Sequence, residues 1–241
     1  MNDHGCLIIG ATGGIGRSLA ARLAARGCRL YIHGRDSKRL ETAASELRRA
    51  GASQVYTLEQ ELSGRDDIHE LISKIKPHRE MIDGLVISYG PIRESSLSRE
   101  NLEDSSFILD MNVLLPLGLI QFLGPVMASN GFGRIVVMGG TASDHNRAYR
   151  KIPVYGAAKY ALNSIVRSAS AEFAASGVTV NAVLPGYVKT EYYSKKSLDT
   201  LKKSGKLLEP EKISDIIEYL MSFRSSAVNG SIINAGAGLE W

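Results

Sequence analysis

The sequence predicts an α/β fold: a doubly wound parallel sheet of about seven strands with helices on both faces, in one domain spanning residues 1–241. Short apolar segments alternate along the chain with longer segments of helical periodicity. A glycine-rich turn follows the first apolar segment, where a strand would pass into a helix. The 241 residues, 44% of them hydrophobic, suffice for one substantial core, and no linker, repeat or low-complexity tract divides them.

Strands are expected where apolar residues are bounded by glycine or polar turn residues. They cover 5–10, 28–33, 54–59, 82–88, 133–138, 178–184 and 230–234. Helices are expected over 14–26, 36–49, 65–75, 99–128 with a break, 153–176 and 210–222. Ligands bind such sheets beyond the carboxyl ends of the strands, so the turns at those ends are where functional residues are expected.

The first of these turns predicts a phosphate site. The apolar strand Cys6–Ile9 leads into Gly-Ala-Thr-Gly-Gly-Ile-Gly at 10–16, after which Ile15, Leu19 and Leu23 keep one helical face inward. Glycines here let the backbone approach a pyrophosphate, whose charge is met by free N–H groups and the helix dipole. The alternative interpretation is a plain tight turn.

Tyr155 and Lys159 form a candidate proton-transfer pair. Their spacing of four residues places both side chains on the same helical face. A phenol with an ordinary pKa of about 10 is a poor acid at neutral pH, and a nearby ammonium shifts it down by favouring the phenolate. Tyr192 and Lys196 repeat the spacing, but the first pair alone has surroundings that suit this chemistry.

With these motifs in this order, the chain resembles the short-chain dehydrogenase/reductase family over nearly its whole length. The resemblance implies a Rossmann-like fold and a cofactor turn made of Gly10, Thr12, Gly13, Gly14, Ile15 and Gly16. It implies a catalytic Tyr155 and Lys159, with Asn112 stabilising a helix break and anchoring a water that relays protons. It assigns the nicotinamide side to Pro185, Gly186, Val188 and Thr190, and the adenine side to Glu61 and Leu62. The alternative for Asn112 is a helix residue bonded to a local carbonyl.

Two positions depart from the family pattern. The family's Asn-Asn-Ala-Gly reads Ile87-Ser88-Tyr89-Gly90, which places a large side chain where the backbone passes close to the cofactor. The active-site serine is displaced as well: counting forward from the strand reaches Gly140, and counting back from Tyr155 reaches Ala142 or Ser143. We expect Ser143, or alternatively Thr141, to donate the missing hydrogen bond.

The end of the second strand predicts the cofactor. An NAD-selecting fold places an acid there, which binds the ribose hydroxyls and repels the extra phosphate of NADP. That position holds Gly34 here, and Arg35 follows it. A guanidinium beside an empty acid position suits a 2′-phosphate, so NADP(H) is expected over NAD(H), with Thr12 as a second phosphate ligand. The alternative is that Arg35 is a solvated residue at a helix start.

The expected function is therefore an NADP(H)-dependent oxidoreductase, an enzyme acting on CH–OH groups with NADP as acceptor. Hydride would pass between NADPH and a carbonyl or secondary alcohol, with Tyr155 as acid or base. The alternative is a dinucleotide-binding scaffold or regulatory subunit with little turnover, which Gly140 and Tyr89 motivate. A non-redox reaction such as dehydration ranks lowest, since it leaves the nicotinamide-side residues without a role.

The expected partner is a small carbonyl or alcohol substrate. Segment 187–208 corresponds to the family's mobile substrate loop and carries six lysines, which would attract an anionic or carrier-linked ketone, although solvated lysines look the same. A net charge of +4 is too small and dispersed to indicate nucleic acid. The resemblance also implies a homodimer or homotetramer.

Cysteine use and apolar runs indicate a cytoplasmic protein without a membrane partner. Cys6 and Cys28 are the two cysteines, too few for a disulfide framework, and no His/Cys cluster has metal-ligand spacing. The longest apolar run, Val113 to Ile120, is interrupted by Pro116 and is too short to cross a bilayer. No secretory signal is evident at the N-terminus.

Overall fold

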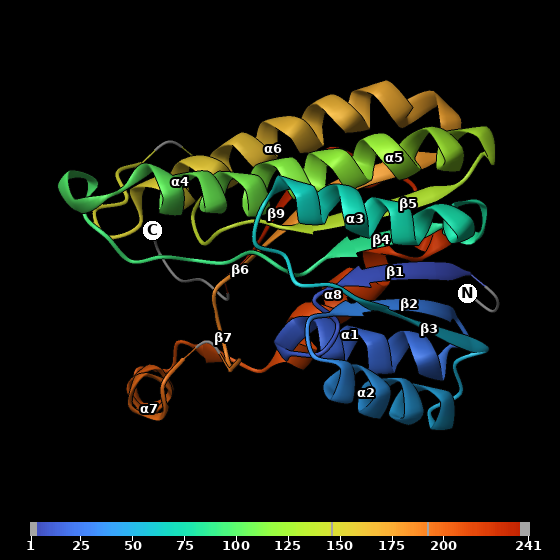
Figure 1. Cartoon of the computed structure of the whole chain (residues 1–241), viewed down its shortest axis with the longest axis horizontal. Coiled ribbons are helices and arrows are strands. Elements are labelled where there is room, and N and C mark those ends of the chain that lie inside the picture. The colour runs from blue at the N-terminus through green and yellow to red at the C-terminus, as the bar shows by residue number, and fades with distance from the viewer. Residues whose placement is uncertain (1–3, 146, 192, 237–241) are drawn as a thin grey trace.

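Seven parallel strands form the central sheet of the protein, seen here in a computed structural model that describes residues 4–145, 147–191 and 193–236 (Figure 1). Their order is β3-β2-β1-β4-β5-β6-β9. The strands are β1 (Gly5–Ile9), β2 (Arg29–Gly34), β3 (Gln54–Glu59), β4 (Gly84–Ile87), β5 (Gly133–Met138), β6 (Val178–Pro185) and β9 (Ile232–Ala235). The doubly wound parallel sheet is confirmed. The ends of the expected 1–241 domain, and Tyr192, lie outside the described residues.

Helices cover both faces of the sheet (Figure 1). One face carries α1 (Gly14–Ala25), α2 (Ser37–Arg49) and α8 (Pro210–Leu220). The other carries α3 (Arg65–Ile75), α4 (Leu102–Leu109), α5 (Leu115–Ser129) and α6 (Pro153–Phe173). Because successive strand residues point to opposite faces, Leu7 and Ile9 of β1 enter one core cluster and Cys6 and Ile8 the other. Burial on both faces explains why the central strands β1, β4, β5 and β6 are largely apolar, whereas the edge strand β3 alternates between exposed and buried residues.

The helix expected over 99–128 begins later and is broken as expected. It starts at Leu102 because the Asn101 side chain accepts a hydrogen bond from the Asp104 N–H at 2.8 Å, which caps the first turn. The break is a π-helical turn, Asp110–Leu114, between α4 and α5. Such turns inside helices are frequent at functional sites, and this one holds Asn112.

Three short elements within the expected substrate loop are not anticipated by the sequence. A parallel pair, β7 (Tyr187–Val188) and β8 (Leu207–Leu208), encloses α7 (Lys195–Lys203). Figure 1 shows α7 standing apart from the three layers. Its residues are half-buried or exposed, so the usual signal of a buried apolar face is weak there.

One helical stretch, Leu102–Ser129, is long and apolar enough to cross a membrane by length and composition. Of its most apolar window, 56% is buried inside the protein. Core helices of water-soluble proteins pass the same test, and α5 packs here against α3 and α6. The apolar surface of the stretch therefore has a place inside this fold.

Candidate active site

The predicted residues gather at the carboxyl edge of the sheet. β1 and β4 are neighbours in the centre, and the chain continues outward from them in opposite directions, which makes this the topological switch point. The segments that follow β1, β4, β5 and β6 all emerge at this edge, because every strand pair is parallel. Doubly wound sheets bind their ligands at such a point.

The glycine turn is shaped to receive an anion. Gly10 and Gly14 have φ of +83° and +45°, a region that favours glycine. A Cβ on Gly16 would lie 2.2 Å from the Gly10 carbonyl oxygen, so Gly16 is needed for the turn to close. Gly13 begins α1 without a side chain to cap it, which leaves the first-turn N–H groups for a ligand.

His33 supports this turn from below, a role that the sequence did not reveal. The Gly10 N–H donates to His33 Nδ1 at 3.4 Å, and His33 Nε2 lies 3.0 Å from the Gln60 carbonyl oxygen. Burial lowers the pKa of His33 to about 4, so the ring is neutral at pH 7. A neutral ring that donates from Nε2 leaves Nδ1 as the acceptor that Gly10 requires.

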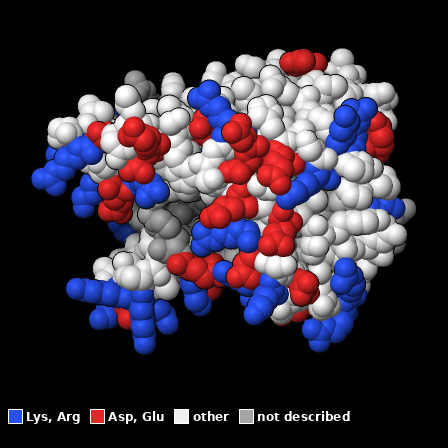
Figure 2. All heavy atoms as spheres, viewed as in Figure 1, with Lys and Arg blue, Asp and Glu red and all other residues white. Residues whose placement is uncertain are grey.

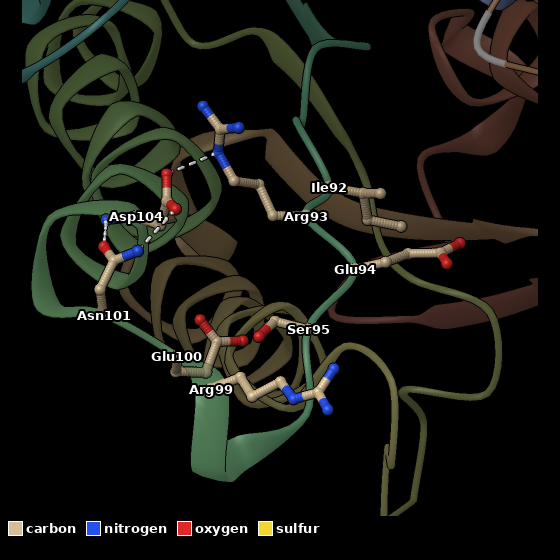
Figure 3. Close-up of a pocket in the computed structure, with 8 residues that line it drawn as sticks. All are labelled: Ile92, Arg93, Glu94, Ser95, Arg99, Glu100, Asn101 and Asp104. Carbon is tan, nitrogen blue, oxygen red and sulfur yellow. Dashed lines mark hydrogen bonds and ion pairs between the residues drawn. The ribbon is translucent and has the colours of Figure 1, made fainter.

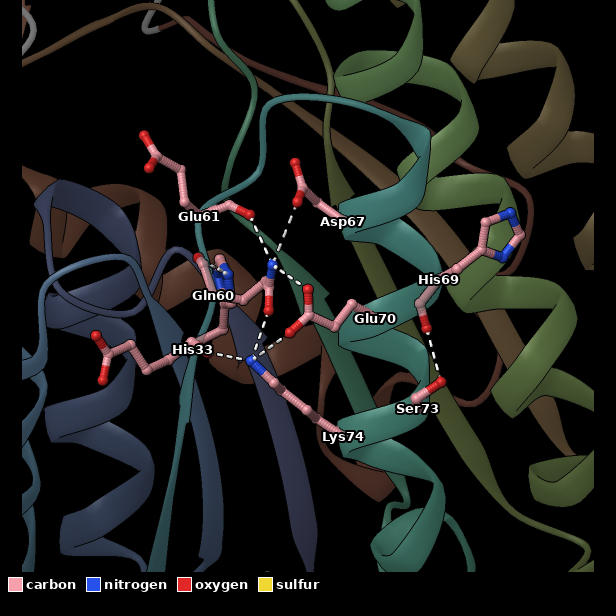
Figure 4. Close-up of polar contacts among 9 residues, drawn as sticks. His33, Gln60, Glu61, Asp67, His69, Glu70, Ser73 and Lys74 are labelled. Carbon is pink, nitrogen blue, oxygen red and sulfur yellow. Dashed lines mark hydrogen bonds and ion pairs between the residues drawn. The ribbon is translucent and has the colours of Figure 1, made fainter.

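Polar contacts tie the end of β3 to α3 (Figure 4). Lys74 Nζ donates to Gln60 Oε1 at 2.6 Å and to the Glu59 carbonyl oxygen at 2.8 Å. The carboxylate of Glu61 points away from this cluster, and the side chain is exposed (Figure 4). Leu62 is buried. Glu61 is thus open to a ligand beyond the edge of the sheet.

Tyr89 lies across the expected adenosine side. Its Cβ is 3.3 Å from the position that a Cβ on Gly10 would occupy, and its hydroxyl donates to the Leu62 carbonyl oxygen at 3.4 Å. Burial raises the pKa of Tyr89. Ser88 turns inward instead, donating to the Ile9 carbonyl oxygen at 2.9 Å. A nucleotide bound here would meet the Tyr89 ring where the family has a small residue.

Tyr155 and Lys159 lie together at the start of α6. Lys159 Nζ is 5.6 Å from the centroid of the Tyr155 ring and donates to the Met138 carbonyl oxygen at 2.7 Å. Lys159 is 3% exposed, whereas Tyr155 is half-buried and reachable. Burial lowers the pKa of Lys159 to about 7. The amine can therefore change its charge near neutral pH, beside a phenol whose ionised form its charge stabilises.

Asn112 meets Lys159 against Gly90. Asn112 Nδ2 donates to the carbonyl oxygens of Pro91 and Ile108, at 3.0 Å each, so it bonds both a local carbonyl one helical turn back and the segment that follows β4. A Cβ on Gly90 would lie 2.7 Å from Asn112 Oδ1 and 2.8 Å from Lys159 Nζ. Among the described residues, Oδ1 finds no hydrogen-bond partner although it is buried. An orphaned acceptor beside a buried amine is a place for a further polar group.

Gly90→Ala should disturb this convergence. The added methyl would press on Asn112 Oδ1 and Lys159 Nζ, so we expect the free energy of unfolding to fall by about 1–3 kcal/mol. Urea denaturation measures the change. Gly64→Ala is the matched control, because a Cβ there meets nothing within 4 Å and the backbone is extended. Equal free energies of unfolding for the two variants would contradict the close approach of Asn112 Oδ1 and Lys159 Nζ to Gly90.

The residue beside Tyr155 at the end of β5 is Gly140. A Cβ on Gly140 would lie 3.4 Å from Tyr155 Cε1 and 3.0 Å from Lys159 Cγ. Ser143 is fully buried, and its hydroxyl accepts a hydrogen bond from the Gly140 N–H at 3.2 Å. Thr141 donates its hydroxyl proton to the Pro185 carbonyl oxygen at 2.8 Å. Counting forward from β5 therefore identifies Gly140 as a residue that faces Tyr155. The hydroxyls of the two alternative residues, Ser143 and Thr141, both bond to the backbone nearby.

The segment after β6 closes over the glycine turn. Pro185 ends β6, Gly186 and Val188 are buried, and the Thr190 methyl lies 2.6 Å from the position of a Cβ on Gly14. Thr190, predicted on the nicotinamide side, and Gly14, predicted on the phosphate side, therefore lie in contact. Together the glycine cradle, the orphaned Asn112 oxygen and the buried amine fit a dinucleotide.

Three further side chains at this edge are absent from the sequence-based prediction. Arg39 donates to the Thr12 carbonyl oxygen at 2.9 Å and pairs with Glu191 at 3.2 Å. Tyr149 donates to the Thr141 carbonyl oxygen at 3.0 Å and packs on Gly156. Arg39 lies one helical turn beyond Arg35, and Glu191 directly follows Thr190, so both adjoin predicted residues.

A surface cleft of about 370 Å³ lies farther along the segment after β4 (Figure 3). Arg93 there pairs with Asp104 at 2.9 Å and lies over the Phe107 ring. None of the predicted site residues lines this cleft. The cleft holds the Arg93–Asp104 ion pair, and Tyr155 and Lys159 lie outside it.

Comparisons with known proteins show which family the chain is similar to. The model of a protein family described as Enoyl-(Acyl carrier protein) reductase matches residues 10–240. An uncharacterised oxidoreductase of Bacillus subtilis, YmfI, is 30% identical, with 96% of this chain and 97% of that protein covered. The 3-oxoacyl-[acyl-carrier-protein] reductase FabG of Rickettsia bellii is 28% identical, with 99% and 98% covered.

Solved structures share the fold. A short chain dehydrogenase/reductase family protein superposes with a TM-score of 0.82 at 29% identity, covering 97% of this chain and 96% of the other. A 3-oxoacyl (acyl-carrier-protein) reductase from Agrobacterium tumefaciens, solved with NADP bound, gives a TM-score of 0.88 at 23% identity over 97% and 93%. The second likeness shows the fold alone.

Proposed function

Because this chain belongs to the short-chain dehydrogenase/reductase family, we propose that it is an NADP(H)-dependent oxidoreductase acting on a carbonyl or secondary alcohol. The observation that carries the proposal is the convergence of Lys159 Nζ and Asn112 Oδ1 beside Gly90, with the centroid of the Tyr155 ring 5.6 Å from the same Lys159 Nζ. Membership of the family supports the coarser part of this proposal, an oxidoreductase that uses a nicotinamide dinucleotide. The direction of reaction, the NADP preference and the individual roles are our proposals.

The bound cofactor supplies or accepts a hydride, and the residues of the chain handle the proton. Tyr155 gives its phenolic proton to the substrate oxygen during reduction and takes it back during oxidation. Lys159 favours the phenolate that is left behind. Asn112 Oδ1, facing Lys159 across Gly90, holds the water through which the proton is replaced.

Gly34 and Arg35 support the preference for NADP(H) over NAD(H). Gly34 ends β2 without a carboxylate, its Cβ position is 3.1 Å from Thr12 Oγ1, and Arg35 next to it is exposed. These observations support our proposal that Thr12 and Arg35 donate to a 2′-phosphate.

Arg35→Asp should reverse this preference. We expect NADPH affinity to fall at least about tenfold while NADH binding holds or improves, since a carboxylate repels the phosphate and accepts from ribose hydroxyls. Nicotinamide fluorescence titration gives both dissociation constants. Lys38→Asp, an equal charge change three residues farther along in the first turn of α2, is the control. An unchanged NADPH/NADH affinity ratio in Arg35→Asp would rule the assignment out.

Ser143 remains our proposal for the second hydrogen-bond donor to the substrate oxygen. Its hydroxyl accepts from the Gly140 N–H and keeps its own proton to donate, but Ser143 is fully buried, so we infer that the 139–143 turn opens to bring it to the substrate oxygen. Ser143→Ala should then lower the rate about a hundredfold, the usual cost of losing one donor to a developing oxyanion. Thr141→Val tests the alternative hydroxyl. A rate unaffected by Ser143→Ala excludes the role.

The proposed substrate is a 3-oxoacyl thioester, anionic or linked to a carrier. Relatives along the whole length of this chain are named as reductases of such compounds. Figure 2 shows Lys and Arg gathered over α7, the part of the substrate loop that projects farthest. A basic lid raises the local concentration of an anionic substrate, and high salt should weaken this effect.

The test begins with the cofactor, because the substrate is inferred. NADPH binding by nicotinamide fluorescence, with NADH as competitor, should show micromolar affinity and weak competition. Acetoacetyl-CoA is then the probe, with NADPH consumption followed by absorbance. If the protein binds neither dinucleotide, we would conclude that the site has lost its cofactor chemistry. The departures from the family pattern at Tyr89 and Gly140 are the reason to consider this outcome. Binding without turnover would favour the scaffold alternative.

The proposed molecule is a cytoplasmic homodimer or homotetramer. Exposed apolar side chains support self-association through α4 and α6: Leu102 is 84% exposed, Leu109 42% and Tyr160 50%. Apolar surface of this kind, carried on neighbouring helices, marks an interaction face. Nucleic acid and membrane are not among the proposed partners.

A further inference from the structure

The segment that follows β7 is tied to α2 directly over the glycine turn. Glu191 Oε1 pairs with Arg39 Nη2 at 3.2 Å, and Glu191 Oε2 lies 2.9 Å from the position of a Cβ on Gly13. A carboxylate thus stands at the uncapped start of α1, held by a guanidinium. The Glu191 carboxylate therefore lies at the helix N-terminus where an anionic ligand would bind.

Arg39 lies close to the end of β2, where Gly34 stands in place of the acid of an NAD-selecting fold. It lies in the first turn of α2, where its backbone N–H donates to Asp36 Oδ1 at 2.9 Å, and its Nη2 also donates to the Thr12 carbonyl oxygen at 2.9 Å. The Thr12 side chain in turn packs against Gly34. Arg39 therefore reaches the same corner as Thr12 and the exposed Arg35.

We propose that Arg39 binds the 2′-phosphate of NADPH, and that Glu191 is an internal carboxylate which this phosphate displaces. The proposal rests on the proposed NADP(H) function. Arg39 and Glu191 are 54% and 63% exposed, so solvent screens their pair, and a phosphate with more charge and more acceptor oxygens competes well. Loss of the pair frees the Thr190–Glu191 segment from the turn, which couples the 2′-phosphate to the substrate loop.

Affinity measurements on four proteins test the binding role. Arg39→Gln should weaken NADPH about tenfold and change NADH less than about twofold. Glu191→Gln should tighten NADPH several-fold and tighten NADH less, and this difference between the two cofactors should vanish in the double variant, because the effect of Glu191 on the 2′-phosphate acts through Arg39. Lys38→Gln removes one positive charge from the neighbouring position and should leave the NADPH/NADH ratio unchanged.

Hydrogen exchange tests the coupling without turnover. In the unaltered protein, 2′,5′-ADP should alter exchange across 187–208 and 5′-AMP should not; Arg39→Gln should abolish the difference. Equal weakening of NADPH and NADH by Arg39→Gln would overturn the proposal, since Arg39 would then merely support the Thr12 backbone. A protein that binds no NADPH at all would instead defeat the proposed function, so the two failures are distinguishable.

Discussion

Tyr155→Phe is expected to lower the rate of acetoacetyl-CoA reduction about a thousandfold while the NADPH dissociation constant stays within about twofold. The variant removes the phenolic proton and keeps the ring that packs against Gly140. General acid catalysis supplies a factor of about 10² to 10⁴, and we expect the loss of the Tyr155 phenol, the proposed acid, to lie in the middle of this range.

Steady-state kinetics together with nicotinamide fluorescence measure both quantities. Tyr160→Phe is the matched control, because Tyr160 lies on the same helix and is 50% exposed. A regulatory scaffold would lose nothing measurable in either variant. Retained reduction by Tyr155→Phe would therefore assign the proton to another group.

Lys159→Met is expected to lower activity about a hundredfold or more and to raise the stability of the protein at pH 7. Activity falls because the charge that favours the Tyr155 phenolate is lost. Stability rises because a buried ammonium is replaced by an apolar chain of similar length, which keeps the packing against Gly140. The expected gain in the free energy of unfolding is about 3 kcal/mol.

The pH dependence follows from the direction of the pKa shift. Burial lowers the pKa of Lys159 from 10.5 to about 7, so between these values the unfolded chain binds more protons than the folded protein. Stability contributed by this residue therefore rises with pH from about 7 to about 10 and is lowest below pH 7. The Met variant should lack this contribution to the slope.

Urea denaturation at several pH values between 7 and 10 gives the comparison. Lys212→Met, an exposed lysine on α8, is the control and should keep the slope of the unaltered protein. If the Lys159→Met protein shows the same rise with pH as the unaltered one, the amine stays charged in the folded state throughout this range.

Much of the fold could be predicted because its signals are local. All seven strands of the main sheet lie within about two residues of the expected limits, since the central strands are apolar runs buried on both faces and the edge strand β3 alternates between exposed and buried residues. The break in the helix over 99–128 was likewise expected and proves to be the π-turn Asp110–Leu114. The elements of the substrate loop escaped prediction because α7 buries no residue fully and β7 and β8 have two residues each.

The fold class, the glycine turn and the pairing of Tyr155 with Lys159 could be predicted from the sequence, because each depends on spacing along one or two adjoining elements. The three-dimensional arrangement was needed to show that Gly140 faces the Tyr155 ring while the hydroxyls of Thr141 and Ser143 bond to the backbone. It alone brought Asn112 Oδ1 to Lys159 across Gly90, and Glu191 to Arg39 across 152 positions of sequence. These contacts join segments that follow different strands of the sheet. The distances between such segments are set by the parallel pairing of the strands, and spacing along the chain does not reveal them.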